Sequence, residues 1–456
     1  MGSSYLSMFL VALLFFGKLY VVYSVKAVFL GSILMFEIGS AVCGSAPNSV
    51  ALIVGRALAG IGSAGIFSGA ITVTEYSVPL HRRPLFQGLF GAVFGLVNVI
   101  SPLLGGAFTD SSATWRWCSS ITLLLKIPDR KINHIPTRQK LAQLDAPGLI
   151  ALLGGVIFLL LALEWGGTTY AWRNGRIIAR LVIAILLMIC FIAVQIIWPY
   201  TATVPPRIFV QRSIMAAFFA MFTAGATMMT TVYYLPIWFQ AVEGVSAVQS
   251  GIRLLPLVVG QVVGSLAGGI GIQNLGYYTP FMRFSIVLMC VGIGLLTTLR
   301  VDTSEGKWIG YQIPYGIGLG TTLQAPLLAA QTVLPLKDVP IGTSLMFFSQ
   351  LLGGAIFVSV GQNLFDNYFV QDLAEPTKGY VVTAYNKTLR KGFITGLVMA
   401  CITFLGAAAM EWKSVKKTAP KADHKNQSDE AARNTNDQMA INAEAGMDEK
   451  KPHIAP

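Results

Sequence analysis

The sequence predicts an all-α protein that crosses a lipid bilayer many times. Of its 456 residues, 54% are hydrophobic and only 12% are charged, whereas soluble domains carry about 25% charged residues. The apolar residues gather in runs of roughly 20, the length that a helix needs to cross a bilayer. The tryptophans fall at or just beyond the ends of these runs, as expected at a membrane–water interface. Together these observations indicate a polytopic membrane protein.

Twelve runs have the length and composition of spanning helices. They cover residues 4–23, 27–46, 49–74, 85–108, 146–165, 177–198, 213–235, 251–272, 281–299, 309–333, 341–361 and 392–411. A thirteenth run, at 117–127, is too short to cross a bilayer unaided. The tail after Trp412 is rich in Lys, Asp, Glu, Asn and Ala, a composition that favours disorder.

The positions of Lys and Arg predict which loops face the cytoplasm, because cytoplasmic loops are enriched in both. Residues 81–84 and 126–140 are basic and are interpreted as cytoplasmic. The run at 85–108 crosses once between them, so a return span is expected before Lys126, where only the short run at 117–127 is available. The same rule assigns 199–212, 273–280, 334–340 and the tail to the cytoplasm, and 166–176, 236–250, 300–308 and 362–391 to the outer side.

Asn386 begins an Asn-Lys-Thr sequon in the last outward segment. A sequon in a loop outside the cell is a candidate glycosylation site. Chance occurrence of so short a motif is almost as good an explanation.

The run from 88 to 110 combines the length of a span with many small residues. Gly95, Pro102, Gly105 and Gly106 all lie within it. Small side chains let another helix approach closely, and proline bends a helix. A tightly packed, bent membrane helix indicates a moving part and therefore a transporter, with a plain packing helix as the alternative.

Two charged residues lie within apolar runs. Arg56 lies in the run 48–74, which is otherwise uncharged, and Glu37 lies in the preceding run. A charge at membrane depth is costly and normally faces a cavity or a partner. We interpret both residues as candidates for proton coupling; a structural ion pair, hydrogen bonding or a snorkelling arginine is the alternative.

Polar but uncharged side chains recur in the later runs. Because amides and tyrosines among Phe, Met and Leu suit a substrate that is largely apolar with a few hydrogen-bonding groups, we interpret them as a candidate substrate cavity. Hydrogen bonding between helices explains each one equally well. The candidates are Tyr233, Tyr234, Gln261, Gln324, Gln331 and Gln350.

Several functions are disfavoured by the sequence. It contains no GxxxxGK[ST] phosphate-binding motif, no Ser/His/Asp or Cys/His set, no CxxC pair and no Cys/His cluster. We therefore expect no catalytic residues, no metal, no cofactor and no direct use of ATP. The net charge of +12 comes from short loops between apolar runs rather than from an aromatic-interleaved basic patch, so a nucleic-acid partner is not expected.

At these residues the chain resembles the major facilitator superfamily, and within it the fourteen-span drug:proton antiporters of the fungal toxin and secondary-metabolite efflux type. GRALAGIGSAGIFSGA at 55–70 is similar to the family's fourth-helix motif, with Arg56 on its arginine, and GLVNVISPLLGG at 95–106 to its antiporter motif. Five further segments resemble sequences that are typical of the fungal subgroup. They are VPPRIF at 204–209, YYLPIWFQAVEGVSAVQSG at 233–251, GYYTPFM at 276–282, VLPLKDVPIGTSL at 333–345 and MEWKSVK at 410–416. The resemblance implies two six-helix bundles joined by an extra helix pair, a central cavity, alternating access and proton-driven export.

The chain departs from the family pattern in its first third. The family's first helix and its acidic motif have no counterpart, and Val21 and Ser101 replace an aspartate and a glycine of the family motifs. After Cys118 the chain runs into a basic loop instead of a full sixth helix. A faint repeat, 101–108 with 349–356, falls in the fourth span of one half and the fifth of the other. We therefore expect the first span and part of the sixth to be missing.

These interpretations combine into one expected organisation. The domains are an incomplete N-terminal bundle at 1–127, a cytoplasmic loop at 128–145, a linking helix pair at 146–198, a linker at 199–212, a C-terminal bundle at 213–412 and a disordered tail at 413–456. We expect a monomer in the plasma membrane that exports small, largely apolar organic compounds in exchange for protons. The alternatives are an uptake carrier of the same fold and a truncated membrane protein that does not transport.

Overall fold

The computed structural model describes residues 2–110, 145–167, 169–372 and 378–416; within these ranges, the side chains of residues 2–7, 98–110, 366–372 and 378–380 are not described. Apart from two isolated bridges, the described backbone forms helices and turns and no strand ladder. The expectations for 117–127, for the loop at 128–144 and for the tail fall outside these residues. Everything below concerns the structural unit that ends at Val415.

Twelve long helices match the twelve predicted spans, so the all-α class is confirmed. Nine of the described helices are long and apolar enough to cross a membrane, and α1 contains a shorter apolar stretch, Met8–Val22. The long helices are α1 (Gly2–Val22), α2 (Val25–Ser45), α3 (Ser49–Ser77), α4 (Arg83–Asp110), α6 (Ala146–Trp165), α7 (Gly175–Ile197), α9 (Arg212–Ala241), α11 (Leu255–Leu275), α12 (Thr279–Leu296), α13 (Glu305–Val333), α14 (Val339–Asp372) and α15 (Lys378–Ala409). The short elements are η1 (Leu80–Arg82), α8 (Pro206–Phe209) and α10 (Ala247–Ile252).

Polar side chains fix where several helices begin. The Asn48 side chain accepts a hydrogen bond from the backbone of Ala51 at the start of α3, and Asn174 does the same for Arg176 at the start of α7. Each satisfies a backbone N–H that the first turn of a helix leaves without a partner. A glycine fixes where α11 ends. Gly276 adopts the left-handed conformation there, with φ of 86°, which glycine adopts without strain.

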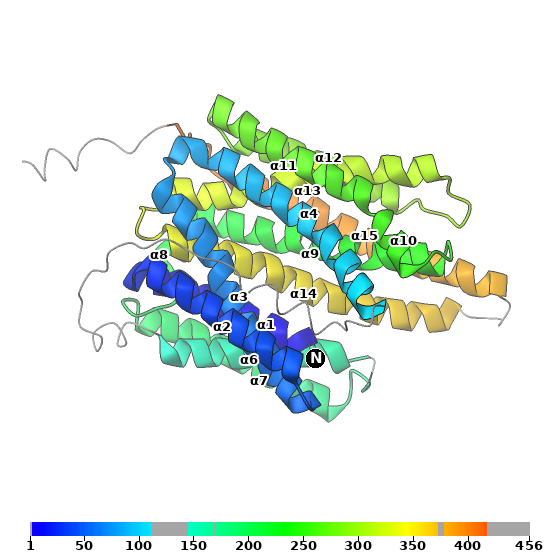
Figure 1. The fold of residues 1–456 in the computed structure, drawn as a ribbon, viewed down its shortest axis with the longest axis horizontal. Helices are drawn as coiled ribbons and strands as arrows, with labels where there is room; N and C mark the ends of the chain where they lie inside the picture. Colours follow the sequence, from blue (N-terminus) through cyan, green and yellow to red (C-terminus); the bar gives the residue numbers. More distant parts are fainter. Residues whose placement is uncertain (1, 111–144, 168, 373–377, 417–456) are drawn as a thin grey trace, which may run out of the picture. The chain divides into compact units, whose positions relative to one another are not determined.

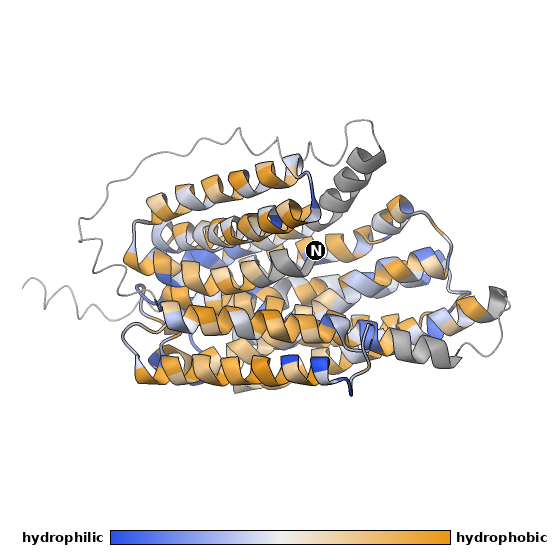
Figure 2. Ribbon diagram, turned by 90° about the horizontal axis from the view of Figure 1, so that it is seen from below, coloured by the Kyte–Doolittle hydropathy of each residue, from blue (hydrophilic) through white to orange (hydrophobic). Residues whose placement is uncertain are grey.

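The helices lie alongside one another and share two ends (Figure 1). We call the end that carries His81, Arg82 and Arg83 the basic end, and the opposite one the far end. Hydrophobic residues cover the lengths of the helices, and hydrophilic residues gather at their ends and turns (Figure 2). This distribution is the one expected for helices that cross a membrane.

We divide the helices into three groups by their order in the chain. We call α1–α4 the N-half, α6 and α7 the linking pair, and α9–α15 the C-half. In the C-half, α9 packs against α14 and α15, and α13 packs against α11 and α12. The N-half meets the C-half where α4 lies on α11 and where α1 lies on α14, and α6 lies against α1 (Figure 1).

Burial distinguishes the central helices from the peripheral ones. Buried side chains make up 72% of the spanning part of α9 but only 17% of that of α7. On α7, side chains such as Leu186 and Ile196 are more than half exposed, as suits a helix that faces lipid. Most of α13 is buried although it carries Gln, Thr, Tyr and five Gly, so most of its polar side chains lie inside the protein.

The outward segment predicted at 362–391 requires correction. The helix α14 continues to Asp372, and α15 already begins at Lys378. Asn386 therefore lies in a helix rather than in a loop; it is only 7% exposed, and its side chain accepts a hydrogen bond from Trp238 Nε1 at 2.8 Å. The prediction of an exposed glycosylation loop at Asn386 is wrong because neighbouring helices satisfy polar residues beyond the apolar run.

Candidate functional site

A seam of small residues joins α4 to α11. A methyl group added at Gly88 would lie 2.8 Å from the carbonyl oxygen of Ser265, and one added at Gly95 would lie 3.3 Å from Val262. Gly91, between them, faces the side chains of Ser265 and Gln324. These glycines therefore let the two halves approach to backbone contact. The surroundings of Pro102, Gly105 and Gly106, further along α4, lie outside the described side chains, and their mobile role remains a prediction.

A cluster of four phenylalanines lies where α1, α3, α4 and α14 meet. The ring centroid of Phe67 lies 4.6 Å from that of Phe347, in an edge-to-face arrangement. The rings of Phe9 and Phe94 lie 6.3 and 6.5 Å from that of Phe67. Aromatic pairs in this range attract one another. The cluster therefore fills the space between the halves with apolar side chains.

The next contacts towards the basic end are polar and cross between the halves. The hydroxyl groups of Ser68 on α3 and Ser344 on α14 lie 2.9 Å apart, and both residues are buried. On α1, Gly17 faces Ser344, and a methyl group there would lie 2.6 Å from the Ser344 Cβ. The small residues Gly17, Ser68 and Ser344 thus close the space between α1, α3 and α14.

Glu75 lies in the last turn of α3 and is only 2% exposed. Gln331 of α13 donates a hydrogen bond from Nε2 to Glu75 Oε1 at 3.1 Å. The guanidinium of Arg83 donates to the backbone oxygens of Glu75, at 2.6 Å, and Val78, at 3.0 Å. A buried carboxyl group from one half therefore contacts an amide from the other.

Glu75 also corrects an expectation from the sequence. The predicted span ended at residue 74 and was considered uncharged apart from Arg56, but α3 continues to Ser77. The span is therefore not otherwise uncharged. The missed signal is the sequence Thr74-Glu75 immediately before the basic turn, because a charge so close to a predicted helix end is usually assigned to the interface.

The chain between α7 and α8, residues 198–205, forms a linker that contacts α1 of the N-half and the linking pair. Lys18 of α1 donates from Nζ to the carbonyl oxygens of Thr201 and Ala202, the latter at 2.7 Å. Asp145 accepts from Gln195 Nε2 at 2.5 Å, from the Thr203 hydroxyl at 3.1 Å and from the Gly148 backbone at 2.9 Å. These groups are buried, so the network fixes the linking pair to α1.

Immediately beyond the linker, Arg207 binds the C-half. Its guanidinium donates two hydrogen bonds to the carboxylate of Asp338, at 2.7 and 2.8 Å, just before α14 begins. Asp338 is 4% exposed and Arg207 is 61% exposed. These hydrogen bonds raise the pKa of Arg207. The paired, planar geometry is the strongest that an arginine and a carboxylate can form.

The amides predicted to line a cavity fall into two places. Gln261, Gln324 and Gln331 are almost fully buried on the side of α11 and α13 that meets the N-half. Gln324 Nε2 donates to the backbone oxygens of Ser265 and Gly320, while its Oε1 has no hydrogen-bond partner. Gln350 instead lies against α9, where its Nε2 is 3.6 Å from the sulfur of Met228. The structure therefore places three of these four amides on the side of the C-half that meets the N-half.

The two tyrosines point in different directions. Tyr234 is buried and donates to the Val358 carbonyl oxygen on α14 at 3.3 Å, whereas Tyr233 is 44% exposed. Arg56 and Glu37 are half-buried on the α2–α3 pair; Arg56 lies beside Cys43. The roles of these four residues in substrate binding or proton coupling remain predictions.

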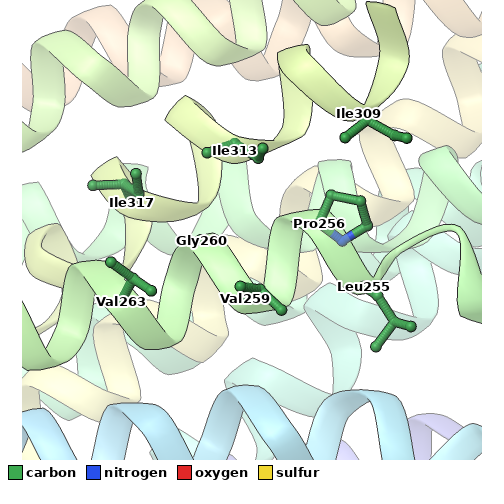
Figure 3. A pocket seen from close by; sticks show the side chains of 8 residues that line it. All are labelled: Leu255, Pro256, Val259, Gly260, Val263, Ile309, Ile313 and Ile317. Atoms are coloured by element: carbon green, nitrogen blue, oxygen red, sulfur yellow. The ribbon is translucent and has the colours of Figure 1, made fainter. Parts of the chain in front are cut away.

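A shallow apolar groove lies on a different face of the C-half, between α11 and α13 (Figure 3). Its walls are formed by Leu255, Pro256, Val259, Gly260 and Val263 of α11 and by Ile309, Ile313 and Ile317 of α13. None of the predicted site residues lines it. With Val259 57% exposed and Val263 50% exposed, this surface has the character of one that contacts lipid.

The fold and the contacts between the halves define a multi-pass membrane transporter. Residues 1–127 match the model of the Major Facilitator Superfamily. The chain is 47% identical to "MFS-type efflux pump MFS1" of Arthroderma benhamiae (strain ATCC MYA-4681 / CBS 112371), over 91% of this chain and 84% of the relative. The chain therefore belongs to the Major Facilitator Superfamily.

Two further comparisons agree with this assignment. An "MFS-type transporter" of Claviceps purpurea (strain 20.1) is 46% identical over 92% of this chain and 80% of the relative. The crystal structure of the human organic anion transporter MFSD10 (TETRAN) shares the fold, with a TM-score of 0.55 and 13% identity over 88% of this chain and 82% of that one.

Proposed function

We propose that this protein exports small, largely apolar organic compounds across the plasma membrane by alternating access, in exchange for protons. The observation that carries the proposal is the interface between the halves. Among the residues that the structure describes, it consists of a glycine seam, an aromatic cluster and a few hydrogen bonds at the basic end. Such an interface can separate and re-form at low cost. The relatives named efflux pumps support the direction of transport.

The residues between the halves favour this class of substrate. Phenylalanine rings supply apolar contact area, and Gln324 offers a buried acceptor oxygen without a partner. Ligand sites of this kind are mostly apolar with a few polar groups that fix orientation. A compound with an apolar body and one or two hydrogen-bond donors would match these side chains once the halves separate.

Export is tested in proteoliposomes that contain the purified full chain. A fluorescent apolar amine is loaded, and its movement is followed with and without an imposed pH gradient. The proposal predicts movement that depends on the gradient and stops when an ionophore collapses it. Movement in the opposite direction under the same gradient would identify an uptake carrier, and no movement with correctly inserted protein would contradict a transport function.

The proposed coupling role of Arg56 is tested in the same vesicles. Because Arg56 places a charge at membrane depth, Arg56→Ala is expected to abolish gradient-driven export while the protein still inserts normally. Arg56→Lys is expected to restore only part of it, since lysine lacks the planar set of donors. Export at the wild-type rate by Arg56→Ala would exclude this role, and Glu37→Gln extends the test to the other candidate.

A further inference from the structure

We propose that Glu75 is a proton-binding residue that keeps its proton while the basic end is closed and releases it on that side when the halves separate. The inference builds on the proposed function and assigns to a specific carboxyl group a step that the sequence did not reveal. It depends on the position of Glu75 at the contact between α3 and α13.

The hydrogen bonds around this carboxyl group fit its neutral form. One oxygen, Oε1, accepts from Gln331 Nε2, and for the other, Oε2, the described residues provide no donor within hydrogen-bond geometry. The Thr343 hydroxyl lies beside the same group and also within reach of the backbone oxygens of Val339 and Pro340. A charge on a carboxyl group that is only 2% exposed is costly unless several donors satisfy it, whereas the neutral group needs fewer of them.

The polar and charged groups near Glu75 belong to its own helix, to the start of α4, and to α13 and α14. On its own helix the neighbour is Tyr76, and at the start of α4 it is Arg83. From α13 and α14 the facing side chains are Gln331 and Thr343, which are uncharged. The Arg83 guanidinium is itself buried and directs its donors to backbone oxygens. Arg83 therefore acts on Glu75 through its charge, which favours ionisation, whereas burial of a carboxyl group that is only 2% exposed favours the neutral form.

Separation of the halves would reverse this balance. Gln331 belongs to the C-half and Glu75 to the N-half, so opening of the basic end removes the amide and admits water. In water a carboxyl group is ionised at neutral pH, while Arg83 stays beside it on the N-half. Proton release would thus be linked to opening. By the same linkage, a higher pH on the basic side favours the open form, by up to about tenfold in the open-to-closed ratio for each pH unit.

The test measures opening directly. All five native cysteines are replaced by serine, and spin labels are placed at His81→Cys and Leu336→Cys, which are exposed on either half at the basic end. The distance distribution is recorded in lipid nanodiscs from pH 5 to pH 9. We expect one short distance at low pH and a growing longer-distance population as the pH rises.

Two variants decide the outcome. Glu75→Gln keeps the shape of the neutral group and cannot ionise, so its labels should stay at the short distance at every pH, while Glu75→Asp should respond to pH. The matched control, Glu305→Gln, removes a far-end carboxyl whose side chain is 75% exposed and should respond like the wild type. A pH response in Glu75→Gln equal to that of the wild type, or no response in the wild type, would overturn the proposal.

Vesicle transport separates this inference from the proposed function. If the labels respond through Glu75 but no substrate moves, proton binding at Glu75 stands and the export function fails. If the wild type and Glu75→Gln export equally well under a pH gradient, the export function stands and the role of Glu75 fails.

Discussion

The two ends of the molecule are held together in different ways. At the basic end, hydrogen bonds join residues of different groups: Glu75 with Gln331, Ser68 with Ser344, and Lys18 with the linker. At the far end, the described hydrogen bonds of Trp238, Gln312 and Arg390 lie within the C-half, while Asn363 Nδ2 of α14 donates to the Leu163 carbonyl oxygen of the linking pair at 3.3 Å. The difference shows which contacts can control opening. Contacts within one half stabilise it, whereas contacts between halves must break during each cycle.

The largest expected effect comes from replacing a closely packed glycine by leucine, first near the basic end and then near the far end. In Gly17→Leu the new side chain collides with Ser344 across the halves, whereas in Gly361→Leu it collides with the Tyr234 hydroxyl within the C-half. Overpacking costs about 1–3 kcal/mol in either case. Gly17→Leu should hold the basic end open, with a longer label distance and loss of transport.

Gly361→Leu should instead lower the melting temperature without lengthening the distance between the labels at the basic end. Gly31→Leu, on a surface where no other side chain lies within 4 Å, is the neutral control. Equal label distances in the Gly17 and Gly361 variants would remove the distinction between the two ends.

A smaller effect is expected when the attachment of α1 to the linker is removed. Lys18→Met keeps the length of the side chain but leaves the buried carbonyl oxygens of Thr201 and Ala202 without this donor. Loss of a buried partner costs about 1–3 kcal/mol, and here the cost falls on the closed form, so the open population should increase. Lys307→Met, at an exposed position at the far end, should leave the label distances unchanged.

Trp238→Phe tests the far end with a conservative change. It removes the donor to Asn386 Oδ1 while keeping an aromatic ring in the core. We expect a loss of about 1 kcal/mol in stability, seen as a lower melting temperature, with transport and label distances retained. A change in the open population would mean that the far end also controls the conformational equilibrium.

The smallest effect is expected for Arg207→Gln. The ion pair with Asp338 joins α8 to the C-half, but the arginine is 61% exposed, and exposed pairs contribute only about 0–1 kcal/mol. The open population should therefore increase slightly, and high salt should reproduce this effect in the wild type. A large, salt-independent effect would show that this pair is screened from solvent when the protein is in its membrane.

The sequence predicted the helices well and the functional contacts only in part. The run at 146–165 matches α6 residue for residue, and Gly88, Gly91 and Gly95 lie in close contact with α11. Errors arose where polar residues lie beyond an apolar run. The buried Glu75 and Asn386 both lie in helices that continue past the predicted span, because a partner on another helix satisfies them. Such partners are distant in sequence: Gln331 follows Glu75 by 256 positions.

The sequence by itself determined the class of protein, the number and approximate location of the long described helices, and the position of the basic end. These properties depend on local composition, because each spanning helix must satisfy its own backbone and cover about 20 residues with apolar side chains. Only the tertiary structure decided that Gln331 faces Glu75, that Gln350 faces α9 rather than the other amides, and that Lys18 holds the linker. The direction in which a helix presents a polar side chain depends on neighbours from other parts of the chain, and no local pattern encodes them.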